Sequence, residues 1–222
     1  MSGRPDTSPL ERIGAEAIEH FGRVNDAREQ ALRACRALIQ ASARSIRAVH
    51  RGEFDEARAM LDEARQAALD AFEPLREFGD VYHAGFVRDA EKEFVEARTT
   101  LALASGEVLP TPAELGVDYA AYLNGIAEAV GEARRLVLDR LRRGQYDGCE
   151  DLLAAMDDIY AVLVTIDFPD AMTGGLRRTT DQTRAILERT RGDLTTAIVQ
   201  REMVRALGAE LPVGEEDGPN PS

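Results

Sequence analysis

Apolar residues recur at steps of three and four along most of this chain, and this spacing constrains the fold more than any other feature. Between residues 86 and 104, for example, one face holds Phe86, Ala90, Phe94, Ala97, Leu101 and Ala104. Such a spacing is the period of one buried helix face, whereas a half-buried strand alternates at every second residue. Helix-forming residues dominate and β-branched runs are scarce, so the sequence predicts an all-α fold.

Glycines, prolines and capping sequences divide the chain into six to seven helices. Capping boxes are predicted at Ser8 to Glu11 and at Thr111 to Glu114. The predicted helices cover approximately residues 9–51, 53–78, 81–105, 117–143, 146–165 and 175–207, and a short turn begins at Thr111. Short connections favour an antiparallel bundle, which we expect to form one domain over residues 8–209. Residues 1–7 and 210–222 are polar and rich in Pro, Gly or acid, which predicts disordered tails.

Two glycines lie inside the predicted helix over residues 117–143. Gly125 and Gly131 each weaken a helix by about 1 kcal/mol relative to alanine. We expect that close approach of a neighbouring element offsets this loss at both positions.

The overall composition is that of an acidic cytoplasmic protein. A formal charge of -13 argues against generic binding to nucleic acid or to an anionic membrane. Lys92 is the only lysine among 27 basic residues, which suits a salt-accumulating cytoplasm, although a GC-rich genome would also favour arginine. Cys35 and Cys149 are too few for a disulfide framework and are expected to be reduced thiols. We find no apolar run of membrane-spanning length and no signal peptide, so a cytoplasmic location without membrane partners is expected.

A basic ridge runs along the first predicted helix of this acidic chain. It consists of Arg33, Arg36, Gln40, Arg44, Arg47 and Arg51. One interpretation is a set of salt bridges to acids on a neighbouring helix. The other is a surface that follows the phosphates of a nucleic acid.

Four glutamates on two long predicted helices are the candidate chemical site. Glu93 and Glu96 border the apolar stripe of one helix, and Glu128 and Glu132 are one turn apart on the other. Burial and mutual repulsion would raise the pKa values of such carboxyl groups, and a cation would relieve both effects. Oxygen ligands select Mg²⁺ or Mn²⁺, which can polarise a phosphoryl oxygen and activate water. From spacing alone, acids on solvated helix faces are the more common explanation, because glutamates are frequent in this chain.

Several other types of site are excluded because their sequence motifs are absent. The sequence has no phosphate-binding Gly-rich loop, no His-Glu-x-x-His and no nucleophile elbow. A di-iron carboxylate bundle needs Glu-x-x-His pairs, but none of His20, His50 and His83 has a glutamate three residues before it.

Several motifs in the same order resemble the translin superfamily, and in particular its archaeal branch. Glu93-Phe94-Val95-Glu96-Ala97 is similar to the Glu-Tyr-Val-Glu-Ala segment of translin-associated factor X. Residues 122–132 are similar to the family pattern Tyr-Leu-x-Gly-Val-Ala-Asp-x-x-Gly-Glu, and residues 35–51 resemble the family's first long helix. Tyr82-His83 resembles a Phe-His pair that precedes the acidic segment. The similarity extends from about residue 10 to residue 200.

The resemblance implies a seven-helix bundle that assembles into closed homo-oligomeric shells with single-stranded RNA or DNA inside. It also implies a Mg²⁺-dependent (or Mn²⁺-dependent) endoribonuclease site, because Glu93 and Glu96 match the acids of translin-associated factor X that translin itself lacks. Glu132 matches the family as well, whereas Glu128 stands where the family has aspartate. The predicted site residues are therefore Glu93, Glu96, Glu128 and Glu132 for metal and catalysis, and Arg47, His50, Arg51, His83 and Arg88 for the nucleic-acid backbone.

Three alternatives remain open at this point. The glutamates could be vestigial, in a non-catalytic shell that binds single strands. The chain could instead be a purely structural helical adaptor, although that would leave the basic ridge unused. His50 and His83 could equally be structural residues held by hydrogen bonds.

Overall fold

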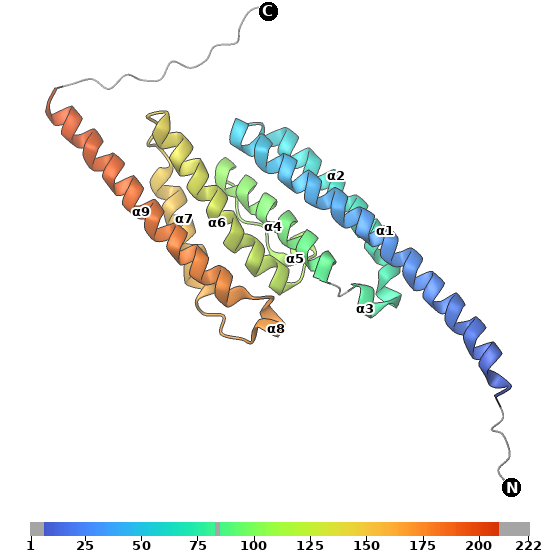
Figure 1. Cartoon of the computed structure of the whole chain (residues 1–222). Coiled ribbons are helices and arrows are strands. Elements are labelled where there is room, and N and C mark those ends of the chain that lie inside the picture. The colour runs from blue at the N-terminus through green and yellow to red at the C-terminus, as the bar shows by residue number, and fades with distance from the viewer. Residues whose placement is uncertain (1–6, 83–84, 209–222) are drawn as a thin grey trace, which may run out of the picture.

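The computed structural model describes residues 7–82 and 85–208 and consists of helices joined by turns and loops (Figure 1). The predicted tails, apart from Thr7, lie outside these residues, as does His83. Six long helices form the body: α1 (Pro9–Arg51), α2 (Phe54–Phe72), α4 (Gly85–Ser105), α6 (Tyr119–Arg142), α7 (Cys149–Leu163) and α9 (Leu176–Ala206). Shorter elements are η1 (Glu73–Glu77), α3 (Gly79–Tyr82), α5 (Pro112–Leu115) and α8 (Asp170–Thr173). The described residues contain no strand, which confirms the predicted all-α class.

Local sequence signals account for most helix ends. Gly52, in the left-handed region at φ 82°, ends α1, which runs unbroken from Pro9. Pro74 lies at the start of the 3₁₀ turn that replaces the last predicted turns of α2. The Thr111–Glu114 capping box forms as predicted. The one predicted for Ser8 does not, because Ser8 itself has helical backbone angles and makes no side-chain capping bond.

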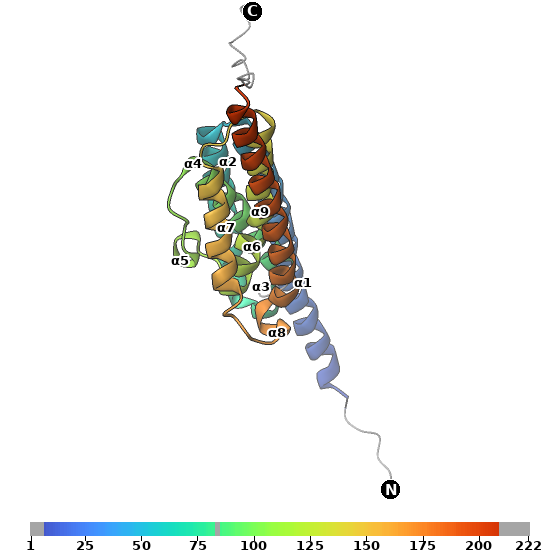
Figure 2. The same ribbon diagram turned by 90° about the vertical axis from the view of Figure 1, so that its left-hand side faces the viewer.

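The sequence alone did not reveal which of the long helices run parallel to one another. α2 and α7 run opposite to α1, α4, α6 and α9 (Figures 1 and 2). Consecutive α4 and α6 are parallel because residues 106–118, which include α5, carry the chain back to the end where α4 begins. The antiparallel prediction therefore holds for neighbours such as α1 and α2 or α6 and α7. The parallel pair places the acidic residues of α4 and α6 at the same level.

The hydrophobic core lies between the long helices where they pack against one another. α4 packs against α1, α2 and α6, and α6 packs in turn against α7 and α9. The largest fully buried side chains include Leu38, Leu61, Phe94, Val130 and Met156. Cys35 and Cys149 are both buried free thiols, as predicted.

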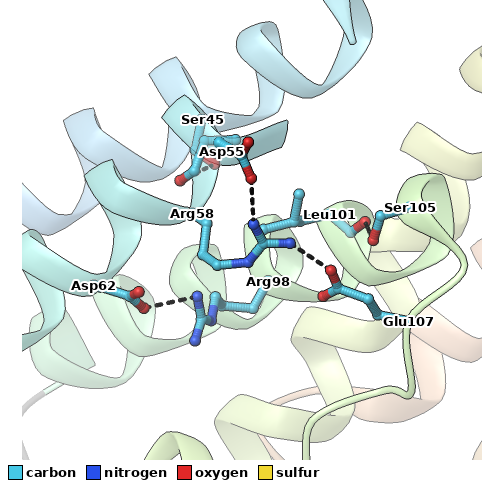
Figure 3. A network of polar contacts seen from close by, with 9 residues as sticks. Ser45, Asp55, Arg58, Asp62, Arg98, Leu101, Ser105 and Glu107 are labelled. Atoms are coloured by element: carbon cyan, nitrogen blue, oxygen red, sulfur yellow. Dashed lines mark hydrogen bonds and ion pairs between the residues drawn. The ribbon is translucent and has the colours of Figure 1, made fainter. Parts of the chain in front are cut away.

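A polar network fixes α2 against the far end of α4 (Figure 3). Arg58 donates to Asp55 at 2.9 Å and also bonds to Glu107, which follows α4. Arg98 of α4 pairs with Asp62 of α2 at 2.9 Å. None of these ion pairs involves the acidic residues of α4 and α6 described below.

The N-terminal end of α1 projects beyond the other helices (Figure 1). Its apolar side chains are largely exposed: Leu10 is 60%, Ile13 51%, Ile18 77% and Phe21 66% exposed. Leu10, Ile13, Ala17, Phe21 and Val24 continue, at steps of three and four, the stripe that is buried further along α1 at Ala27, Ala31, Cys35 and Leu38. The same helix face is therefore covered in one half and uncovered in the other.

Within the described ranges, no helix combines the length and the apolar character needed to cross a membrane.

Candidate metal centre

α4 and α6 approach each other closely at Gly125. A Cβ atom placed on this glycine would lie 2.6 Å from Val95 Cβ and 2.7 Å from the Lys92 carbonyl oxygen. The expected close approach is therefore confirmed at Gly125. It is wrong at Gly131, where a Cβ would meet nothing within 4 Å. The adjacent Val130 is fully buried, so Gly131 lies on a different side of α6 from the packed one.

Three of the four predicted glutamates converge one turn from this contact. Glu93 and Glu96 of α4 and Glu128 of α6 each offer a carboxylate oxygen, and these oxygens lie within 4.8 Å of one another. All three side chains are half-buried. Oxygens at this separation can bind a single hard divalent cation.

The electrostatics of the triad favour a bound cation. Burial, followed by the charges of Glu93, Glu128 and Glu132, raises the pKa of Glu96 to about 8. Burial also raises the pKa of Glu93, and the Glu128 charge adds to this effect. Concentrated, partly desolvated negative charge of this kind is relieved when a positive ion binds between the carboxylates.

The fourth glutamate is hydrogen-bonded to a histidine. His50 of α1 bonds through Nε2 to Glu132 at 2.5 Å, and only 6% of the His50 side chain is exposed. This hydrogen bond lowers the pKa of Glu132. A nucleic-acid contact of His50 and a metal-ligating role for Glu132 stay predictions.

Lys92 is the site residue that sequence reasoning missed. Its Nζ lies 2.8 Å from Glu128 Oε1 and 3.8 Å from Glu93 Oε1, so the ammonium group lies between the two helices that supply the triad. The available signal was its identity as the only lysine of an arginine-rich chain, at a position directly before Glu93.

The basic ridge is exposed along α1. Arg51 donates to Glu53 at 2.7 Å. Arg33, Arg36, Arg44 and Arg47 are exposed and form no ion pair with any residue that the structure describes. The salt-bridge interpretation is therefore wrong for most of the ridge. Arg47 and Arg51 lie within one turn of His50, so the ridge ends beside the acidic residues.

Arg88, the remaining predicted backbone contact, lies on α4 one turn before Lys92. Its Nε is 3.9 Å from an Asp118 carboxylate oxygen and its side chain is 38% exposed. The contact of Arg47, Arg51 and Arg88 with nucleic acid stays a prediction.

The chain is similar to proteins of known structure. AfC3PO, known alone and in a complex with duplex RNA, is 35% identical to this chain with a TM-score of 0.79, and the match covers 84% of this chain and 97% of AfC3PO. Apo-NeC3PO is 20% identical to this chain with a TM-score of 0.72, and the match covers 89% of this chain and 100% of NeC3PO. It has the same fold. An uncharacterized protein of Methanocaldococcus jannaschii is 29% identical over 185 residues, which are 82% of this chain and 81% of that protein. No protein-family model matches the chain.

Proposed function

The chain belongs to the translin (C3PO) family, and we propose that it binds RNA and cleaves single-stranded RNA with a divalent metal ion. The observation that carries this proposal is the convergence of Glu93, Glu96 and Glu128 from two parallel helices, with carboxylate oxygens within 4.8 Å of one another. Mutual repulsion opposes the convergence of acids that merely solvate a helix face, and the one ammonium group of Lys92 offsets only part of the charge of three carboxylates.

The donor set fits a hard cation such as Mg²⁺ or Mn²⁺. Glu93, Glu96 and Glu128 would hold the ion. When bound, it would polarise the phosphodiester and activate water for hydrolysis. Glu128 stands where the resemblance gives aspartate, and the close helix contact at Gly125 lets the longer side chain reach the same group of oxygens. Glu132, fixed by His50, would add negative charge beside the site in a defined orientation.

The basic ridge would supply the contacts to the RNA backbone. Arginine forks match phosphate oxygens, and Arg33, Arg36, Arg44 and Arg47 of the ridge form no ion pair with an acid of the described residues. The related AfC3PO forms a complex with duplex RNA, so duplex as well as single-stranded RNA is a candidate ligand for this chain.

Self-association into a closed homo-oligomer is part of the same proposal. The projecting end of α1 exposes an apolar stripe that continues the core stripe of the same helix. A second copy of this chain would cover it, because it continues a pattern that elsewhere packs against helices of this fold.

Cleavage of labelled RNA tests the proposal. Single-stranded and duplex RNA are incubated with the protein in Mg²⁺, in Mn²⁺ and in chelator, beside a Glu93→Gln/Glu96→Gln variant. The matched control is Glu63→Gln/Glu188→Gln, which removes two exposed glutamates from α2 and α9. We expect metal-dependent cleavage that is lost only in the first variant. Ionic strength is held constant because phosphate contacts weaken steeply with salt.

The remaining outcomes separate the alternatives. RNA binding without cleavage under all metal conditions would leave a non-catalytic shell. Absence of both binding and cleavage would leave a structural adaptor. Equal loss of cleavage in both double variants would show that the effect is not specific to the triad.

A further inference from the structure

Lys92 occupies a position between two of the proposed metal ligands. Its ammonium nitrogen is 2.8 Å from Glu128 Oε1 and 3.8 Å from Glu93 Oε1, and both acids belong to the triad. Its side chain is 25% exposed, so the charge is partly withdrawn from water. An ammonium group in such a place satisfies the same carboxylate oxygens that a divalent ion would need.

The backbone of Lys92 belongs to the interior of α4 and packs against α6. Its carbonyl oxygen lies 2.7 Å from the position of a Cβ on Gly125. The side chain, in contrast, has four flexible methylene groups that can carry the ammonium group to the exposed edge. The lysine can therefore leave the acids only by rotation of its side chain.

We propose that Lys92 is a tethered counter-cation that neutralises Glu93 and Glu128 in the metal-free protein and competes with the divalent ion for them. This inference rests on the proposed metal centre. Three carboxylates without a cation repel one another, and one ammonium group offsets part of that repulsion. A divalent ion offsets more of it, but it must first displace the lysine.

Titration with Mn²⁺ tests the competition directly. Binding is measured calorimetrically for the wild type, Lys92→Met and Lys92→Arg, with Arg98→Met as the control. Arg98 also lies on α4 and forms an ion pair. Its partner, however, is Asp62 of α2 and not a member of the triad. We expect Lys92→Met to bind Mn²⁺ about tenfold more tightly than the wild type, since a partly buried cation is removed. Lys92→Arg and Arg98→Met should bind within about threefold of the wild type, since both leave a cation at the triad.

Stability gives a second readout that does not depend on catalysis. In chelator, Lys92→Met should unfold at lower denaturant concentration than the wild type, because its triad lacks a counter-cation. Saturating Mn²⁺ should remove this difference, because the lysine is then displaced from the triad in the wild type as well. Lys92→Gln repeats both measurements if the methionine variant folds poorly.

The outcomes distinguish this inference from the function on which it rests. Mn²⁺ binding of equal or lower affinity in Lys92→Met than in the wild type overturns the competition and leaves the metal centre standing. Absence of Mn²⁺ binding in every variant, including Lys92→Met and Lys92→Gln, overturns the metal centre itself and the competition with it.

Discussion

Replacement of Gly125 by alanine should disturb the fold and the site together. The added Cβ would lie 2.6 Å from Val95 Cβ and 2.7 Å from the Lys92 carbonyl oxygen. Ordinary contacts between such atoms are about 3.5 Å or longer, so α6 must move by about 1 Å away from α4. The carbonyl oxygen is backbone within a helix and cannot rotate aside.

The expected magnitude follows from two opposing effects. Alanine favours a helix interior over glycine by about 1 kcal/mol. Overpacking of a close helix contact destabilises by about 1–3 kcal/mol. We therefore expect Gly125→Ala to lower the free energy of unfolding by about 1 kcal/mol, and by up to about 2 kcal/mol if α6 moves as a rigid body.

Gly131 provides the matched control on the same helix. A Cβ there meets nothing within 4 Å, so Gly131→Ala should stabilise the protein by up to about 1 kcal/mol. Denaturant unfolding of both variants, in chelator, measures the difference. Gly125→Ala should also bind Mn²⁺ at least about tenfold more weakly, because ligand distances tolerate changes of only about 0.2 Å. A Gly125→Ala protein as stable as Gly131→Ala would refute the reasoning.

Three further predictions concern charge and assembly. Because the pKa of Glu96 is raised to about 8, its ionised form is disfavoured in the folded protein. In chelator, the wild type should therefore lose stability relative to Glu96→Gln as pH rises from about 4.5 to 8, by on the order of 2 kcal/mol. Free energies of unfolding that change in parallel with pH in the two proteins would contradict this. Arg44→Gln/Arg47→Gln should weaken RNA binding and make its logarithmic salt dependence shallower by about 2, measured by anisotropy from low to high salt; an unchanged slope would remove the ridge from the interface. Phe21→Asp, on the uncovered stripe of α1, should reduce the assembled mass measured by light scattering, whereas Ala15→Asp on the opposite side of the helix should not; equal masses would show that the stripe is not an interface.

Periodicity predicted which residues are buried but not which helix covers them. The stripe that includes Phe94 and Ala97 is buried as expected, and the helix boundaries agree within four residues for the long helices, except that α2 ends six residues before its predicted end. The direction of α6 relative to α4 depends on the path of residues 106–118, which no local pattern specifies. The sequence thus predicted two carboxylate pairs, and only the parallel arrangement explains why three of these acids meet.

The partners of the acids were also beyond local reasoning. Glu132 bonds to His50, which is 82 positions earlier in the chain, and a residue this distant carries no periodic signal. Lys92 and Glu128 are likewise on different helices. Gly125 and Gly131 look alike in sequence, but one faces α4 closely and the other faces open space. The acidic residues of the candidate site were predictable from the sequence, whereas their pairing required the fold.

The two buried cysteines make this protein well suited to site-selective labelling. Burial, together with the Glu91 charge, raises the pKa of Cys35 to about 12, and burial also raises the pKa of Cys149. The thiolate is the reactive form, so both native thiols should resist alkylation near neutral pH. A cysteine introduced at Arg44 would then be the single fast-reacting thiol. A fluorophore attached there would report on the proposed binding of RNA at the surface of α1.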